Sequence, residues 1–231
     1  LLLTNEHVTH DRELCEIFAV YFNFRACDPA EDPQIFVLDP KSFYFESEEH
    51  DFAIVGVKPR ADDPDQRPPG ERLSFIELRR HPTYVYEVAA EGAGQAATGM
   101  PVNIIHHPGG GVKKITIRNN RVHKAYHADH RPWVFTYTTD TDGGSSGSPL
   151  FDDDWTLIGI HCAEGSRQNG RVLYNVGVRI DKVIEHIRSL PAIDGRSQDA
   201  FWSMVGPAAR PVKGAPPTTD TASVCAERTP E

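Results

Sequence analysis

Residues 141–150, TDGGSSGSPL, place two adjacent serines in a run of small residues that ends at a proline. A serine hydroxyl is a poor nucleophile until a base takes its proton. Nucleophilic chemistry in this segment therefore requires a histidine, and usually a carboxylate that orients the histidine ring. Two interpretations of the segment differ in which serine reacts.

The first interpretation takes Gly143, Ser145 and Gly147 as GxSxG, the strand-to-helix elbow of α/β-hydrolases, with Ser145 as nucleophile. That elbow needs a helix directly after the serine. The sequence continues instead with Pro149 and LFDDDWTLIGIHC, a pattern typical of a turn followed by a strand. The following sequence therefore does not favour the elbow.

The second interpretation makes Ser146 the nucleophile, with a histidine and an aspartate upstream in the order His, Asp, Ser. Both partners stand beside apolar runs, since LLLTNEHV contains His7 and EEHDFAIVGV contains Asp51. The surrounding glycines let the backbone turn, so that the N–H groups of Gly144 and Ser146 can converge on an oxyanion.

Three ordered blocks, LLTNEHV, HDFAIV and GSSGSPLF followed by LIGIH, resemble the catalytic blocks of chymotrypsin-fold serine peptidases of the bacterial trypsin-like and glutamyl-endopeptidase type. The stretches VNIIHHPGGGVKKITIRNNRV and YTTDTDGGSSGSP also resemble that group, so the resemblance covers residues 1–190. It implies two six-stranded antiparallel β-barrels with the site between them. It also makes His7 the general base, Asp51 the orienting carboxylate and Ser146 the nucleophile of an endopeptidase. The alternative is a peptidase-like module that binds peptides with little or no turnover.

The same resemblance supplies three candidate residues for the pocket that holds the P1 side chain. Asp140 lies six positions before Ser146, where trypsins carry the aspartate that pairs with Arg or Lys. Thr141 and His161 lie where glutamyl endopeptidases bind a substrate carboxylate. A carboxylate at Asp140 attracts a guanidinium and repels another carboxylate, so a basic P1 residue is favoured and an acidic one stays open.

Other chemically capable side chains have plainer interpretations. Ser145 replaces the aspartate that precedes the nucleophile in digestive trypsins, so a zymogen switch of that kind is not expected. His106 and His107 stand before PGGG without a partner pattern and are interpreted as structural. Cys162 is interpreted as a packed thiol because nothing nearby would lower its pKa.

The elements that must position these groups are short runs rich in Val, Ile, Phe and Tyr, separated by Gly, Pro, Asn and Asp, as in all-β barrels or sandwiches. They span residues 16–24, 52–57, 102–107, 114–122, 133–139, 155–162 and 172–180. Helical spacing of apolar residues predicts one helix over residues 180–190, formed around Ile180, Val183, Ile184, Ile187 and Leu190.

We expect three parts along the chain. Residues 1–75 form a partial first barrel, and residues 76–190 form the second barrel with the nucleophile loop and the C-terminal helix. Residues 191–231 form a linker or disordered tail, in which 197–206 is either a short docking segment or the stump of another module. In this fold the histidine follows the third strand, so we expect an amino-terminally truncated first barrel and a fragment of a larger multidomain protein.

Composition limits the partners. The chain has 24 Lys and Arg against 33 Asp and Glu, a formal net charge of −9, which disfavours nucleic acid and anionic membranes. No run approaches the roughly 20 apolar residues that cross a bilayer. The four cysteines show no zinc-like spacing, so no metal or cofactor is predicted. They favour a cytoplasmic location, while pairing of Cys15 with Cys27 and secretion stay open. The expected partner is a protein or peptide substrate.

Overall fold

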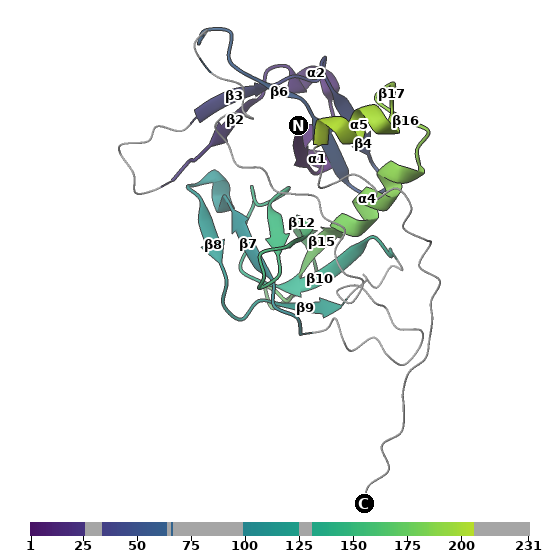
Figure 1. Cartoon of the computed structure of the whole chain (residues 1–231). Helices are drawn as coiled ribbons and strands as arrows, with labels where there is room; N and C mark the ends of the chain where they lie inside the picture. The colour runs from purple at the N-terminus through teal and green to yellow at the C-terminus, as the bar shows by residue number, and fades with distance from the viewer. Residues whose placement is uncertain (26–33, 64–65, 67–98, 125–130, 206–231) are drawn as a thin grey trace, which may run out of the picture.

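The computed structural model describes residues 1–25, 34–63, 66, 99–124 and 131–205. Two curled antiparallel sheet units lie one above the other in Figure 1, and the helix α4 (Ile180–Ser189) runs between them. This is the mostly β, chymotrypsin-like architecture with a C-terminal helix that the sequence predicts. The expected boundary between residues 75 and 76 lies outside the described residues.

The first unit contains two small sheets, with strand orders β1-β5-β4 and β2-β3-β6. Gly56 joins β5 to β6 and so carries the chain from one sheet to the other. A Cβ at Gly56 would lie 2.2 Å from the Ser42 hydroxyl and 2.6 Å from the Asp39 carbonyl oxygen, so only glycine fits this bend. The strands are β1 (Leu2–Thr4), β2 (Ala19–Phe22), β3 (Gln34–Leu38), β4 (Tyr44–Ser47), β5 (Phe52–Val55) and β6 (Val57–Lys58).

The second unit is one antiparallel sheet of order β8-β7-β11-β12-β15-β10-β9. The chain before β7 pairs with β9 through a bridge between Pro101 and Arg121, which brings the two edges of the sheet together into a barrel. The strands are β7 (Asn103–His106), β8 (Lys114–Thr116), β9 (Arg121–Lys124), β10 (Val134–Thr138), β11 (Pro149–Phe151), β12 (Leu157–Glu164) and β15 (Asn175–Arg179). A small hairpin of β13 (Arg167–Gln168) and β14 (Arg171–Val172) follows β12.

The second sheet has seven described strands where the resemblance implied six. The single run 114–122 divides into β8 and β9, and β11 lies outside the expected runs. Asn119 takes a left-handed conformation with φ of 58°, which Asn adopts more readily than most residues, and the Asn120 amide closes the turn onto the Thr116 carbonyl at 3.0 Å. The two halves then lie at opposite edges of the sheet order.

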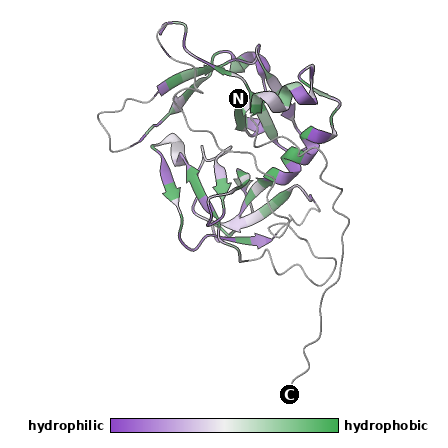
Figure 2. Cartoon of the chain, viewed as in Figure 1, coloured by the Kyte–Doolittle hydropathy of each residue, from purple (hydrophilic) through white to green (hydrophobic). Residues whose placement is uncertain are grey.

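Helix α4 joins the two units through one shared core. Its buried side chains are the apolar residues that the helical spacing singled out, Ile180, Val183, Ile184 and Ile187. They pack in a cluster with Phe52 of the first unit and with strand residues of the second unit. Figure 2 shows hydrophobic and hydrophilic residues alternating along α4, as expected of a helix with one buried face.

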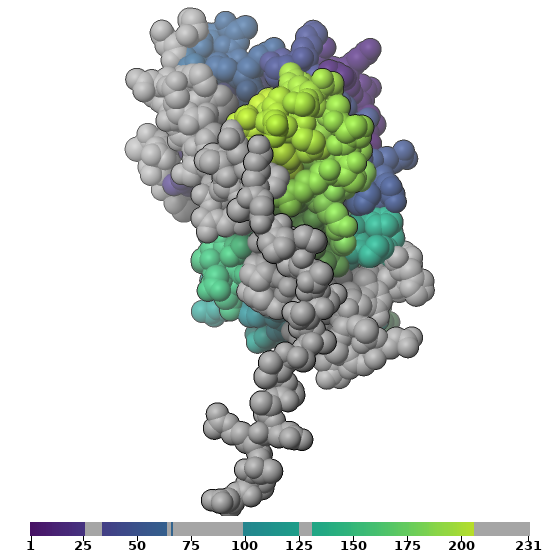
Figure 3. All heavy atoms as spheres, turned by 45° about the vertical axis from the view of Figure 1, so that its right-hand side comes forward, coloured from purple at the N-terminus to yellow at the C-terminus, as the bar shows by residue number. Residues whose placement is uncertain are grey.

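Residues 192–205 are folded, which corrects the expectation of a linker from residue 191 onward. They form β16 (Ala192–Ile193), β17 (Arg196–Ser197) and α5 (Gln198–Val205). Phe201 is fully buried, with its ring 5.7 Å from the ring of Phe43, and Trp202 is 3% exposed. In Figure 3 this yellow-green segment covers one side of the first unit. These two large aromatic side chains bury the apolar surface that stabilises the segment, which the rest of the tail sequence has little of. Residues 206–231 lie outside the described residues.

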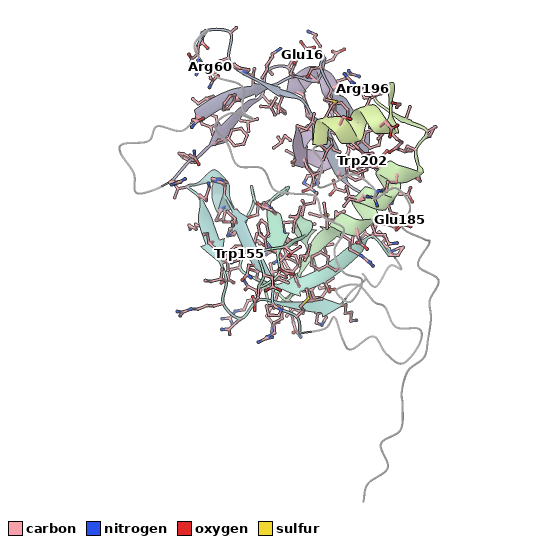
Figure 4. All side chains as sticks on the ribbon, in the orientation of Figure 1. Glu16, Arg60, Trp155, Glu185, Arg196 and Trp202 are labelled. Atoms are coloured by element: carbon pink, nitrogen blue, oxygen red, sulfur yellow. The ribbon has the colours of Figure 1, made fainter. Side chains whose placement is uncertain are left out.

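Trp202 also fixes α5 against α4. Its indole N–H donates to the Gln198 side chain at 2.8 Å, and the guanidinium of Arg188 on α4 lies 5.3 Å from the centre of its ring. Figure 4 labels Trp202 in the region where α5 approaches α4. The C-terminal segment therefore packs against both the first unit and the preceding helix.

Candidate active site

Three side chains from separate parts of the chain form one hydrogen-bonded row. His7 lies on the short helix α1 (Glu6–Thr9), which directly follows β1. Its Nδ1 atom lies 2.9 and 3.0 Å from the two carboxylate oxygens of Asp51, and its Nε2 atom lies 3.0 Å from the hydroxyl oxygen of Ser146. The first unit supplies the imidazole and the carboxylate, and the second supplies the hydroxyl. Such a row can take a proton from a serine hydroxyl.

The backbone of Asp51 is arranged to aim its carboxylate at His7. Asp51 lies in the turn before β5 with φ of 48°, a left-handed conformation that is uncommon outside glycine. The backbone N–H of His7 also donates to the Asp51 carboxylate at 3.1 Å. The side chains of His7 and Asp51 are 46% and 24% exposed, so the row is open to solvent and to a substrate.

Asn5, which the sequence interpretation did not single out, connects the two halves of this row. Asn5 occupies the N-cap position of α1, but its side chain does not cap the helix. Instead its amide donates to the Asp51 carbonyl at 2.9 Å, and its Oδ1 atom accepts from the Gly147 N–H at 2.6 Å. Asn5 is fully buried. The only signal in the sequence is its place between an apolar strand and His7.

Cys162 on β12 is half-buried and faces the Asp51 carboxylate. Burial, followed by a hydrogen bond with that carboxylate, raises the pKa of the Cys162 thiol well above its usual range. A thiol in this state is a poor nucleophile. The structure therefore agrees with a packed thiol.

Residues 139–148, between β10 and β11, form the loop that carries Ser146, the expected nucleophile, and we call it the nucleophile loop. It presents two backbone N–H groups, those of Gly144 and Ser146. Gly144 and Gly147 have φ of 86° and 78°, conformations that favour glycine. Among the described residues, the N–H groups of Gly144 and Ser146 have no hydrogen-bond acceptor. A Cβ at Gly147 would lie 2.5 Å from the Thr4 hydroxyl oxygen, so the loop approaches the end of β1 at backbone distance.

Ser145 forms a second serine–histidine pair, with a different environment. Its hydroxyl oxygen lies 3.0 Å from Nδ1 of His106, and Nε2 of His106 lies 3.2 Å from the Thr116 hydroxyl. Ser145 is fully buried, and within the described part of the chain no carboxylate bonds to His106. Strand β11, not a helix, follows the loop, which excludes the hydrolase elbow.

The three candidate pocket residues have unequal environments. Asp140 is exposed, and in the described ranges its carboxylate has no ion-pair or hydrogen-bond partner. The Thr141 hydroxyl donates to the Asn175 side chain at 2.9 Å, and His161 is 4% exposed on β12. Among the described residues, Asp140 is thus the one pocket candidate with a negatively charged side chain, and that carboxylate has no partner there.

His161 is held as a neutral ring. Its Nδ1 atom lies 2.7 Å from the hydroxyl of Tyr137, which is fully buried. The Tyr137 hydroxyl has no other acceptor in the described structure, so we assign it as the donor, which leaves the His161 proton on Nε2. Burial, followed by the charge of His106, lowers the pKa of His161 to about 4. His161 therefore offers a hydrogen bond but no positive charge at neutral pH.

The described residues contain no group of three or more His, Cys, Asp or Glu side chains that could hold a metal ion. No helix in these ranges is long and apolar enough to span a membrane. Cys15 is a free, buried thiol whose S–H group contacts the Thr9 carbonyl at 3.7 Å. Cys27, its suggested partner, lies outside the described residues.

Comparisons with known proteins gave a family match and a distant relative. A family model for the trypsin-like peptidase domain matches residues 1–160. An uncharacterised protein, y4fB, of Sinorhizobium fredii is 28% identical over 169 residues, and the match covers 71% of this chain but only 24% of that protein.

Two solved structures are similar in fold. The HtrA-type protease AlgW with a decapeptide gives a TM-score of 0.50 at 18% identity, over 81% of this chain and 47% of AlgW. The MamO protease domain from Magnetospirillum magneticum, in its apo form, gives a TM-score of 0.50 at 12% identity, over 80% of each chain. At these identities the likeness concerns the fold.

Proposed function

Because the chain belongs to the family of trypsin-like peptidase domains, we propose that it is an endopeptidase in which His7, Asp51 and Ser146 act as a catalytic triad. Membership of that family makes it a serine peptidase whose substrate is a protein or peptide. The assignment of the three roles rests on one observation, the continuous row from the Asp51 carboxylate through both His7 nitrogens to the Ser146 hydroxyl.

The proposed reaction follows from that row. His7 Nε2 takes the Ser146 hydroxyl proton as the oxygen attacks the substrate carbonyl, and Asp51 holds the other ring proton on Nδ1. The N–H groups of Gly144 and Ser146 bind the developing oxyanion. The imidazolium then gives its proton to the leaving amine, which leaves an ester on Ser146. Water, deprotonated by His7, cleaves that ester and restores the serine.

A fluorophosphonate probe tests the triad, since it reacts only with an activated serine. The wild-type protein is expected to be labelled, and Ser146→Ala is expected to lose both labelling and turnover, with kcat lowered by roughly 10⁶-fold. Ser145→Ala is the matched control, and it should keep its labelling site. Labelling that survives Ser146→Ala but disappears in Ser145→Ala would assign the nucleophile to Ser145. A folded wild type that is never labelled would favour the peptide-binding module.

For the P1 side chain we propose a preference for Arg or Lys. The support is electrostatic, because Asp140 supplies a carboxylate that has no partner among the described residues, while His161 is neutral and the Thr141 hydroxyl donates to Asn175. A substrate guanidinium can pair with Asp140, whereas a substrate carboxylate would meet repulsion without a compensating cation.

A peptide library measures this preference directly. Cleavage after Arg or Lys is expected, and Asp140→Asn should lower kcat/KM on those substrates by about 10- to 100-fold, the value of a hydrogen bond to a charged group. Substrates with an uncharged P1 residue serve as the control and should change little. Cleavage confined to sites after Glu would exclude the preference while leaving the triad proposal intact.

A further inference from the structure

The segment His106–Gly111, HHPGGG, lies directly against the nucleophile loop, although the triad does not use it. It begins at the end of β7 and continues into the single turn η2 (Pro108–Gly110). Gly109 and Gly110 both have positive φ, of 66° and 65°. The turn brings the Gly109 N–H to 2.6 Å from the Gly143 carbonyl oxygen.

This bond fixes a peptide plane that matters for catalysis. The Gly143 carbonyl and the Gly144 N–H belong to the same planar, trans peptide unit, so they point in opposite directions. With the carbonyl bound to Gly109, the Gly144 N–H points away from Gly109 and, among the described residues, has no acceptor. Rotation of this peptide would break the bond and exchange an N–H donor for a carbonyl oxygen.

The two loops touch backbone to backbone. A Cβ placed on Gly144 would lie 2.9 Å from the Gly110 nitrogen and 3.2 Å from the His107 carbonyl oxygen. No side chain fits between the loops, so movement of one loop displaces the other. The contact therefore restricts movement of Gly144 relative to the segment His106–Gly111.

His106 provides a second attachment, through Ser145. The Ser145 hydroxyl oxygen accepts from the Asp142 N–H at 3.4 Å, so its own proton is available to Nδ1 of His106 at 3.0 Å. With Nδ1 as acceptor, the His106 Nε2–H donates to the Thr116 hydroxyl on β8. Ser145 is fully buried. It lies between Gly144 and Ser146, whose N–H groups bond to no acceptor among the described residues.

The segment is in turn braced against the first unit. The His107 ring stacks on the Phe24 ring at 6.1 Å, and the Lys113 N–H donates to the Phe24 carbonyl at 2.8 Å. His107 also bonds the Gly111 carbonyl through Nδ1 at 3.0 Å. The nucleophile loop is thereby connected to the end of β2 by a route that does not pass through the triad.

We infer that His106–Gly111 is a positioning segment that holds the Gly144 and Ser146 N–H groups in the orientation that stabilises the oxyanion. The inference rests on the proposed function and deepens it. His106 and Gly109 do not touch the substrate; they act through Ser145 and Gly143. Loss of the contacts that the segment makes with Ser145 and Gly143 should therefore weaken binding of the transition state. Ground-state binding of the substrate should stay nearly unchanged.

The test uses His106→Leu, which removes both ring hydrogen bonds, and His106→Asn, whose Oδ1 atom can replace Nδ1 as the acceptor for Ser145. His106→Leu is expected to lower kcat by about 10- to 100-fold, somewhat less than removal of an oxyanion donor, while KM changes by less than about 2-fold. His106→Asn should recover part of kcat. His123→Leu is the control, because it removes another histidine–threonine hydrogen bond from the same barrel, 3.3 Å in length.

A peptide aldehyde supplies the decisive readout. The Ser146 hydroxyl adds to the aldehyde carbonyl and forms a hemiacetal, whose oxygen lies at the oxyanion donors. The corresponding product peptide forms no covalent bond with Ser146. The aldehyde Ki should rise in proportion to the loss of kcat, while the product Ki stays the same. Ser145→Ala is expected to behave in the same direction, and it serves if His106→Leu does not fold. Faster hydrogen exchange at the Gly109 amide in His106→Leu would report release of the Gly143 carbonyl.

The outcomes separate the two proposals. An unlabelled, inactive wild type would contradict the triad itself. A labelled and active wild type, with kcat and aldehyde Ki within about 2-fold in both His106→Leu and Ser145→Ala, would overturn only the role of the segment. Equal losses in aldehyde and product binding would also overturn it, because they indicate general loosening of the site.

Discussion

Substitution of Asn5 gives the most specific test of how the triad is aligned. Its side chain bonds both to Asp51 and to the backbone beside Ser146. Asn5→Ala removes the donor to the Asp51 carbonyl and the acceptor of the Gly147 N–H. The Gly147 N–H keeps a second acceptor, the His161 carbonyl at 2.9 Å, so only the Asp51 carbonyl is left without the partner that Asn5 supplied.

The expected cost follows from those contacts. A carbonyl left unpaired in a partly buried site costs about 1 to 3 kcal/mol, and the second lost bond adds about 1 kcal/mol. The free energy of unfolding should therefore fall by about 2 to 4 kcal/mol. Because Asn5 also sets the distance between Asp51 and the nucleophile loop, kcat/KM should fall by roughly 10- to 100-fold, mostly in kcat.

The control is Asn103→Ala. Asn103 is another buried amide, 4% exposed, and its side chain donates to the Asp152 carbonyl and the Asp153 carboxylate at 3.0 Å each. Its loss should lower stability by a similar amount and leave kcat/KM within about 2-fold of wild type. Urea unfolding and steady-state kinetics on both variants give the comparison. If Asn5→Ala keeps its kcat/KM as Asn103→Ala does, the side chain does not align the triad.

Three further predictions follow from buried groups. Trp202→Ala should lower the free energy of unfolding by about 3 to 5 kcal/mol in urea titrations, and an unchanged midpoint would mean that α5 does not contribute to the fold. Cys162→Ser retains a donor to Asp51 and should keep kcat/KM within a few-fold, whereas Cys162→Ala should lose about 10-fold; equal kinetics would show the contact to be dispensable. Stability should decline as pH falls from about 6.5 toward 4, because the unfolded chain protonates His161 in that range and the folded ring, with its pKa near 4, does not; His161→Gln should flatten this decline, and an unchanged slope would contradict it.

The sequence predicts local features well where one segment carries its own pattern. Helix α4 was predicted because its apolar residues repeat at helical spacing within eleven residues, and each expected strand run contains a strand in the structure. The strands β3 and β4 were not singled out. Their burial depends on pairing with β2, β6 and β5, which no short stretch of the sequence reveals.

In the candidate site, too, the sequence predicted the residues that stand in a local pattern and missed those that depend on distant partners. The order of His7, Asp51 and Ser146 identified three side chains that the structure joins in one row, and their catalytic roles stay a prediction. Asn5 was missed because its two partners are 46 and 142 residues away in the sequence. The partnership of Ser145 with His106 spans 39 residues and was missed for the same reason.

The contact between Phe43 and Phe201 has a consequence for the order of events during synthesis. The ribosome synthesises the strands of the first unit early, but α5, which completes part of their core, is synthesised much later. The hydrogen bond from the Tyr44 N–H to the Asp194 carboxylate likewise joins residues 150 positions apart. When His7 and Asp51 have left the ribosome, the nascent chain therefore still lacks part of the packing around them. We expect the fold around His7 and Asp51 to be complete only after α5 has been synthesised.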